Sequence, residues 1–247
     1  MRSTPRRLLP PVVSLLAATA WTATAVRAQD VTIGGPAEVT NASPFTNYHF
    51  QLPNRYQQLY AASGFSGPVL IDAIRLSNTL SVAAGLPASI ANGEYLVRFA
   101  VTDRPENGLG TDFDANVGGF ASTFFAGLFT AGGQRLAGTP YLYDPARGNL
   151  LLDVTVLSQA DVGVLGFDYA RSAADGTSRV SHYFPPPFTP PFPVVADAGG
   201  LVTTFETRPV VAAVPEPASV LLVGAGLAGL AARHRRRRHS PGPFVSQ

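Results

Sequence analysis

Two histidines, His49 and His182, are the side chains in the central part of the chain best suited to bind a metal or to move a proton near neutral pH. A zinc site needs three or four ligands at a recognisable spacing, and no third ligand stands at such a spacing from either histidine. The chain has no cysteine, which excludes disulfides, thiolate metal ligands and cysteine nucleophiles. We therefore expect no cofactor and a structural role for both histidines.

A second candidate for metal chemistry is the stretch Asp112, Asp114 and Asn116, which resembles the start of a calcium-binding loop. An EF-hand would have glycine at the sixth position and glutamate at the twelfth, where this chain has Val117 and Thr123. The stretch is therefore not an EF-hand. A looser calcium site is one interpretation, and a polar turn between two strands, which we favour, is the other.

Carboxylates and aromatic rings are the side chains that would act on or bind sugars. Paired carboxylates perform glycoside hydrolysis, but fifteen of them in the region before the tail always allow some pair, so their number selects none. Tyrosines could stack on sugar rings or pack in the interior, and we expect packing. The tyrosines concerned are Tyr48, Tyr56, Tyr60, Tyr141 and Tyr143.

The segment GAGLAG, residues 224–229, fits the G-x-G-x-x-G pattern of dinucleotide-binding turns. That site also requires a preceding strand, further strand–helix units and an acidic residue about 20 positions later. No acidic residue follows Glu216. The pattern is therefore a coincidence within an apolar run rich in glycine and alanine.

The first 28 residues have the features of a secretory signal peptide. Arg2, Arg6 and Arg7 form a basic start, and residues 8–26 are mostly apolar. Val26-Arg27-Ala28 then has small residues at the positions that a signal peptidase reads. We expect cleavage after Ala28 and export of the remainder.

The tail carries a short apolar run, residues 218–232, which would measure about 22 Å as a helix. This length is below the roughly 30 Å hydrocarbon core, but arginine snorkelling and local thinning of the bilayer can cover the difference. We predict a single transmembrane helix. A face of small residues would allow close contact with another helix. This face comprises Gly224, Ala225, Ala228 and Gly229.

Arginines follow the apolar run at once, and the positive-inside rule would hold them on the cytoplasmic side as a stop-transfer signal. They are Arg233, Arg235, Arg236, Arg237 and Arg238.

The order of Pro215-Glu216-Pro217, a short apolar helix and an arginine cluster resembles the PEP-CTERM sorting signal of exported bacterial proteins. The resemblance implies that an exosortase, a membrane protease-transpeptidase, recognises this triplet, cuts near it, and releases the body or attaches it at the cell surface. It further implies a producer that makes exopolysaccharide. The stretch from Tyr141 to Asp153 is similar to one found in some ectodomains of this class.

The region between the two signals is acidic, although the whole chain has a formal charge of +2. All 18 basic residues are arginines, and nine of them lie in the region from Gln29 to Val214, against fifteen aspartates and glutamates. The resulting charge of −6 excludes a nucleic-acid partner, which would need a basic surface.

Short apolar stretches separated by Gly, Pro, Asn and Asp predict an all-β body, a β-sandwich of jelly-roll type. A period of two in Glu94–Thr102 is typical of a half-buried strand. One face would hold Tyr95, Val97, Phe99 and Val101, and the other Leu96, Arg98 and Ala100. The predicted strands are 55–61, 68–77, 94–102, 122–129, 149–157, 162–170, 179–184 and 201–207. The proline-rich residues 185–193 are expected to form a stiff loop.

We therefore predict a signal peptide (1–28), a β-sandwich ectodomain (29–212), a sorting signal (213–239) and a disordered tail (240–247). The expected function is that of an exported cell-surface or matrix protein with a structural or adhesive role in exopolysaccharide or biofilm, and no enzymatic activity. Its precursor would be anchored in the inner membrane. A secreted carbohydrate-binding module is the alternative, and a glycoside hydrolase is a third.

Overall fold

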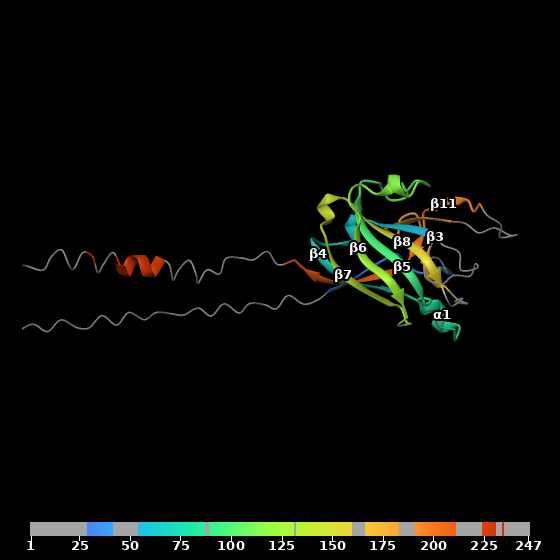
Figure 1. Cartoon of the computed structure of the whole chain (residues 1–247), viewed down its shortest axis with the longest axis horizontal. Helices are drawn as coiled ribbons and strands as arrows, with labels where there is room; N and C mark the ends of the chain where they lie inside the picture. The colour runs from blue at the N-terminus through green and yellow to red at the C-terminus, as the bar shows by residue number, and fades with distance from the viewer. Residues whose placement is uncertain are drawn as a thin grey trace, which may run out of the picture.

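The computed structural model describes residues 29–41, 54–86, 89–130, 132–159, 166–182, 191–210, 224–230 and 234. These residues form antiparallel strands arranged in three sheets, with little helix (Figure 1). The all-β prediction is confirmed, while the jelly-roll type of sandwich stays a prediction. The strands are β1 (Gln29–Ile33), β2 (Val39–Asn41), β3 (Asn54–Tyr60), β4 (Val69–Leu76), β5 (Gly93–Thr102), β6 (Ser122–Phe129), β7 (Arg135–Tyr143), β8 (Asn149–Gln159), β9 (Phe167–Ala170), β10 (Thr177–His182), β11 (Val194–Asp197), β12 (Gly200–Leu201) and β13 (Thr203–Pro209).

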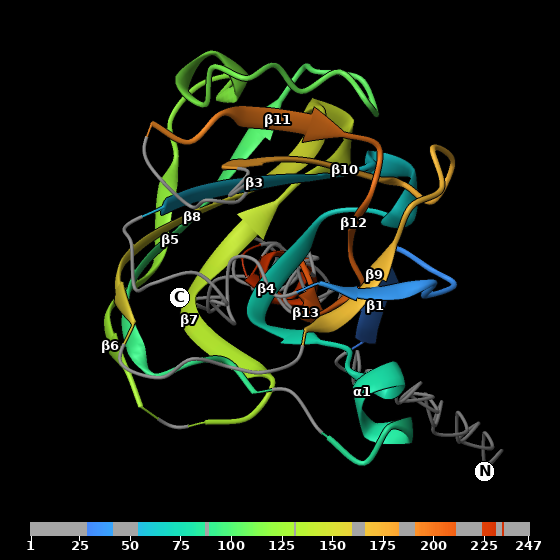
Figure 2. The ribbon, with the colours of Figure 1, turned by 90° about the vertical axis from the view of Figure 1, so that its right-hand side faces the viewer.

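Two larger sheets enclose the main core. One has the order β1-β13-β4-β7 and the other the order β11-β10-β3-β8-β5-β6. Figure 2 shows β11, β10 and β3 above β4, β13 and β1. Alternate residues of β5 and β8 face inward, as the period of two predicts, and Tyr95, Val97 and Phe99 are fully buried there. They pack with residues such as Ile74 and Phe205 from the opposite sheet in one apolar cluster.

The outward face of the six-stranded sheet is also covered. The long connection between β5 and β6 lies over it, seen in green at the top of Figure 2. Leu109 from this connection packs with Leu59, Ala100 and Leu151 in a second, smaller cluster. The connection contains one turn of 3₁₀ helix, Asp114–Asn116. The sheet is thus buried on two sides, one by a sheet and one by a loop.

The remaining elements are small. A third sheet has the order β12-β9-β2. A short α-helix, α1 (Thr79–Ala83), packs against β9. The buried carboxylate of Asp168 on β9 accepts hydrogen bonds from the backbone N–H of Thr79 (2.9 Å) and Leu80 (3.0 Å). A carboxylate from another strand therefore satisfies the first N–H groups of this helix, a role usually taken by a neighbouring residue.

The turn predicted at Asp144 is confirmed. Its Oδ1 accepts a hydrogen bond from the backbone N–H of Ala146 (3.0 Å) and caps the 3₁₀ turn Pro145–Arg147. The following strand begins at Asn149, as predicted. The sequence did not predict β1, β2, β7, β11 or α1.

Candidate functional site

Most of the predicted sorting region lies outside the described residues. This holds for the cleavage residue Ala28, for Pro215, Glu216 and Pro217, and for Arg233 and Arg235–Arg238. Residues 224–230, which include the predicted small-residue face Gly224, Ala225, Ala228 and Gly229, are helical and exposed. No helix within the described parts of the chain has the length and apolarity needed to cross a bilayer. The predicted transmembrane helix thus stays a prediction.

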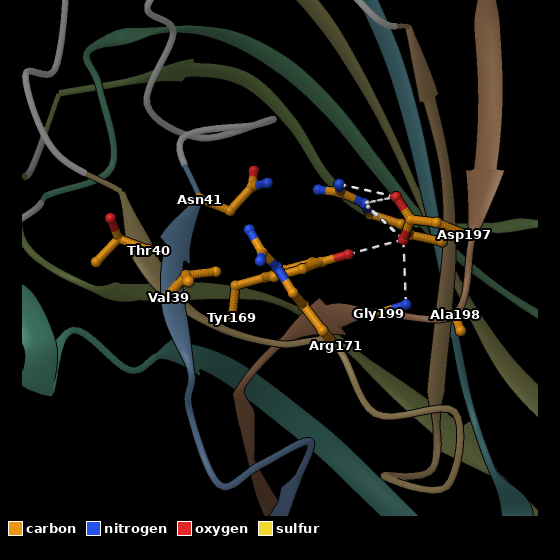
Figure 3. Close-up of a pocket in the computed structure, with 9 residues that line it drawn as sticks. Val39, Thr40, Asn41, Tyr169, Arg171, Asp197, Ala198 and Gly199 are labelled. Carbon is orange, nitrogen blue, oxygen red and sulfur yellow. Dashed lines mark hydrogen bonds and ion pairs between the residues drawn. The ribbon is translucent and has the colours of Figure 1, made fainter.

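The body contains a cavity of about 390 Å³ between the three-stranded sheet and the edge strand β11 (Figure 3). Its floor is Tyr169 of β9, and Figure 3 shows the hydroxyl of this residue directed towards Asp197 at the end of β11. Strands β2, β9, β10 and β11 and the turn after β11 all contribute residues. The lining comprises Val39, Thr40, Asn41, Tyr169, Arg171, Arg179, Asp197, Ala198 and Gly199.

Asp197 is the centre of the polar contacts in this cavity. Both its oxygens accept hydrogen bonds from the guanidinium of Arg179, at 2.9–3.1 Å. Its Oδ1 also accepts from the hydroxyl of Tyr169 (2.7 Å) and from the backbone N–H of Gly199 (3.1 Å). The Arg179 guanidinium stacks 4.3 Å from the centre of the Tyr169 ring. Arg179 therefore joins β10, β11 and β9.

These contacts fix the charge states of the two acidic groups. Burial raises the pKa of Asp197, but the bonds from Arg179 and Tyr169 outweigh it and leave that pKa below its ordinary value. Burial raises the pKa of the Tyr169 hydroxyl well above 10. At neutral pH the site therefore holds an ionised carboxylate whose oxygens are occupied, and a neutral phenol that already donates to it. Neither group is available as a general base.

Arg171 supplies the remaining charge in the cavity. Its side chain is exposed, and it forms no ion pair with any described residue. The cavity can therefore hold a polar or anionic group against Arg171.

A second polar centre lies under the β5–β6 connection. The side chain of Asp153 on β8 is fully buried and accepts two hydrogen bonds from Arg55 (2.8 and 2.9 Å) and one from Arg98 (2.6 Å). Arg55 also contacts Asp114 of the connection (2.7 Å). The bond to Asp153 raises the pKa of Arg55 further, so the guanidinium is permanently charged. This centre holds the connection on the sheet.

The calcium candidates Asp112, Asp114 and Asn116 all bond to protein groups. Asp112 Oδ1 accepts from the backbone N–H of Asp114 (3.0 Å), which in turn pairs with Arg55. Asn116 is fully buried and exchanges two hydrogen bonds of 2.8 Å with the backbone of Gly110. The three side chains act in three separate contacts, and the choice between a looser calcium site and a polar turn stays a prediction.

Of the predicted histidines and tyrosines, His49 and Tyr48 lie outside the described residues. The Nδ1 of His182 accepts a hydrogen bond from the backbone N–H of Arg55 (3.4 Å), consistent with a structural role. The described residues contain no group of three or more His, Asp or Glu placed to hold a metal. Packing is confirmed for three of the tyrosines, which are fully buried: Tyr56, Tyr60 and Tyr143.

Sequence reasoning missed Arg179 and Asp197 as partners. Asp197 lies on β11, a four-residue strand preceded by a proline-rich stretch, and no alternation marks it as a strand. The pairing of β10 with β11 brings Arg179 opposite Asp197. A single sequence carries no signal for this pairing.

Comparison with known proteins identifies one segment. Residues 213–237 match the family described as the PEP-CTERM protein-sorting motif. No curated protein and no solved structure matches the chain. The resemblance drawn from Pro215-Glu216-Pro217, the apolar run and the arginine cluster is therefore confirmed. The chain is an exported protein that carries a PEP-CTERM sorting motif, the signal of exosortase substrates.

Proposed function

We propose that the chain is a structural or adhesive protein of the cell surface or extracellular matrix, which associates with exopolysaccharide after an exosortase has processed an inner-membrane precursor. The observation that carries this proposal is the sorting motif at residues 213–237, placed directly after an all-β body whose last strand ends at Pro209. The body would then carry the function, and the tail would serve only as the sorting signal. We propose no enzymatic activity for it.

The arrangement of the first and last strands fits a body that is presented at the cell surface. β1 begins at Gln29, the residue after the predicted cleavage site, and pairs antiparallel with β13, so that Gln29 lies opposite Thr207. The Thr207 hydroxyl donates a hydrogen bond of 2.6 Å to the carbonyl oxygen of Gln29. Both signals therefore connect to the same end of the same strand pair.

The tether between body and motif is short. Only residues 210–214 separate the end of β13 from Pro215. Fully extended, this segment spans about 20 Å. A precursor held by its tail would keep the body close to the membrane surface, and cleavage near the triplet would remove the apolar run and the arginines while leaving the folded sheets intact.

The direct test is the intact mass and C-terminal peptide map of the protein from its native host. We expect a chain that starts near Gln29 and ends near Pro215–Pro217, recovered from the cell surface or the medium. A chain that still ends at Gln247 in the inner membrane would mean that the tail is a plain anchor, and would overturn the proposal.

A variant tests recognition of the triplet itself. Glu216→Ala leaves the apolar run unchanged but removes the single charge between the two prolines, so we expect processing to be abolished and the full-length precursor to accumulate. The matched control is Glu94→Ala, the same substitution at an exposed position of β5, which should be processed like the parent. Equal processing of the Glu216→Ala variant would exclude a protease that reads this glutamate.

A further inference from the structure

A second cavity, of about 420 Å³, lies where β5, β6 and β7 approach the covering connection. It shares no residue with the cavity around Asp197. Both aromatic and charged side chains line it, together with a run of two glycines. The lining comprises Val101, Asp103, Gly118, Gly119, Phe120, Ser122, Tyr141, Leu142 and Arg147.

Phe120 is the unusual residue of this cavity, because its side chain is 99% exposed. Large aromatic side chains normally contribute their area to a core, and full exposure of one beside a cavity is informative. The preceding Gly118 lies directly against β5: a Cβ there would be 2.8 Å from the carbonyl oxygen of Val101. The backbone thus holds Phe120 at the edge of the cavity while its ring makes little contact with the protein.

Tyr141 provides a second, fixed ring. It is half-buried and stacks on the buried Phe99, with ring centres 5.3 Å apart and planes inclined by 30°. Burial raises the pKa of its hydroxyl, and the nearby Arg147 acts in the opposite direction without cancelling the rise. The hydroxyl is therefore neutral at physiological pH and can both donate and accept a hydrogen bond.

The cavity also contains two charged groups of opposite sign. Asp103 and Arg147 are both exposed, and neither forms an ion pair with any residue that the structure describes. A carboxylate that only accepts and a guanidinium that only donates stand beside the hydroxyl of Ser122. A ligand with one charge would be repelled by one of the two. A neutral ligand rich in hydroxyl groups can satisfy both.

We propose that this cavity binds a neutral pyranose unit of a polysaccharide. The C–H groups of one sugar face would pack on the electron-rich face of Phe120 or Tyr141, and the hydroxyl groups would donate to Asp103 and accept from Arg147. This inference rests on the proposed function, since it names the ligand class through which the body adheres to exopolysaccharide.

Affinity electrophoresis of the exported chain tests this site, with dextran, xylan, alginate or the producer's own exopolysaccharide in the gel. We expect retardation by at least one neutral polysaccharide, and weaker retardation by the anionic alginate because the body carries a net charge of −6. Phe120→Ala should weaken binding about tenfold, the size of one lost stacking contact. Leu128→Ala is the control, since Leu128 is also exposed but does not line the cavity.

Two glycine variants provide a matched pair in which no other lining residue is substituted. Gly118→Ala would force the connection away from Val101 and displace Phe120, so it should weaken binding severalfold. A Cβ at Gly119 meets no atom within 4 Å, so Gly119→Ala should bind like the parent.

Asp103→Asn and Arg147→Gln should each weaken binding, because each removes a charge that strengthens a hydrogen bond to a hydroxyl group.

In the gels, the site would be overturned by a parent that none of the four polysaccharides retards, or by a Phe120→Ala variant that binds as tightly as the parent. Binding of a polyproline peptide in place of sugars would also overturn it and assign the aromatic rings to a protein ligand. These outcomes are separate from those of the sorting test. A chain cut near Pro217 that binds no polysaccharide leaves the sorting proposal standing, whereas a binding chain that still ends at Gln247 leaves only the sugar site.

Discussion

Asp153 and Glu206 make the same kind of contact on the outward faces of the two large sheets, yet in different surroundings. Asp153 bridges Arg55 and Arg98 beneath the β5–β6 connection, and its side chain is fully buried. Glu206 bridges Arg75 and Arg135 on a face that is open to solvent. Each carboxylate bridges two arginines, so a comparison of the two bridges shows the effect of the covering connection.

The comparison indicates that an ion pair contributes more to stability when protein covers it than when the same contacts are open to solvent. Water screens the Glu206 bridge, and pairs of this kind contribute about 1 kcal/mol or less. The connection excludes most of the water from the Asp153 bridge. Removal of one charge would therefore leave the others buried without a partner, which is strongly destabilising. The connection over Asp153 also carries Leu109 and, at its end, Phe120. The covered face is thus the one that positions the proposed sugar site.

The largest effect is expected on the inward side of the strand that carries Glu206. Phe205 is fully buried, with its ring centre 4.8 Å from that of Tyr60 and 5.4 Å from that of Phe65. Phe205→Ala should lower the free energy of unfolding by about 4 kcal/mol, because it leaves a cavity between the sheets. Urea unfolding measures this loss, and Phe120→Ala, the same substitution at a 99% exposed ring, should leave the midpoint unchanged. Similar midpoints for the two variants would contradict the assigned core.

The next effect tests the comparison itself. Asp153→Ala should lower the free energy of unfolding by about 3 kcal/mol, because Arg55 and Arg98 lose their partner in a place largely shielded from water. Glu206→Ala also leaves two arginines without a carboxylate, but both are near half exposed, so the loss should stay within about 1 kcal/mol. Equal losses in urea unfolding would show that the connection does not shield Asp153.

The inward faces were predictable from the sequence, and the covered outward face was not. The alternation in β5 and β8 marks Tyr95, Val97 and Phe99 as core, because a strand places every second residue on the same side. The same rule places Arg98, and Asp153 on its own strand, on the side opposite to the core residues. It could not reveal that residues 103–121 return to cover them, because this connection has no periodicity and its position depends on distant contacts.

The candidate sites also differ in whether the sequence could predict them. The sorting signal is linear, so its residues could be recognised in the order in which they are written. The cavities combine residues from segments far apart in the sequence, such as Asp103, Phe120 and Arg147. The missed strand β7 carries Tyr141, and its Gly-Thr-Pro stretch reads as a turn. In the structure this stretch is an irregularity within the strand, and β7 pairs with β4 on both sides of it, Ala137 with Ala73 and Tyr141 with Ile71. Tertiary pairing overrode the local signal there.

The smallest expected effect concerns the protonation of Glu206 on the solvent-exposed face. The bond from Arg135 holds the pKa of Glu206 below its ordinary value of 4.5. The folded state therefore binds a proton there less readily than the unfolded state, and the stabilisation is fully present above pH 4.5 and lost as the pH falls through the lowered pKa. The difference in unfolding free energy between the parent and Glu206→Gln should thus be small near neutrality and vanish in acid. Added salt at 0.5 M should reduce it at neutral pH, since the bridge is exposed. A difference that persisted unchanged through acid and salt would place Glu206 in surroundings like those of Asp153, and the contrast between the two faces would fail.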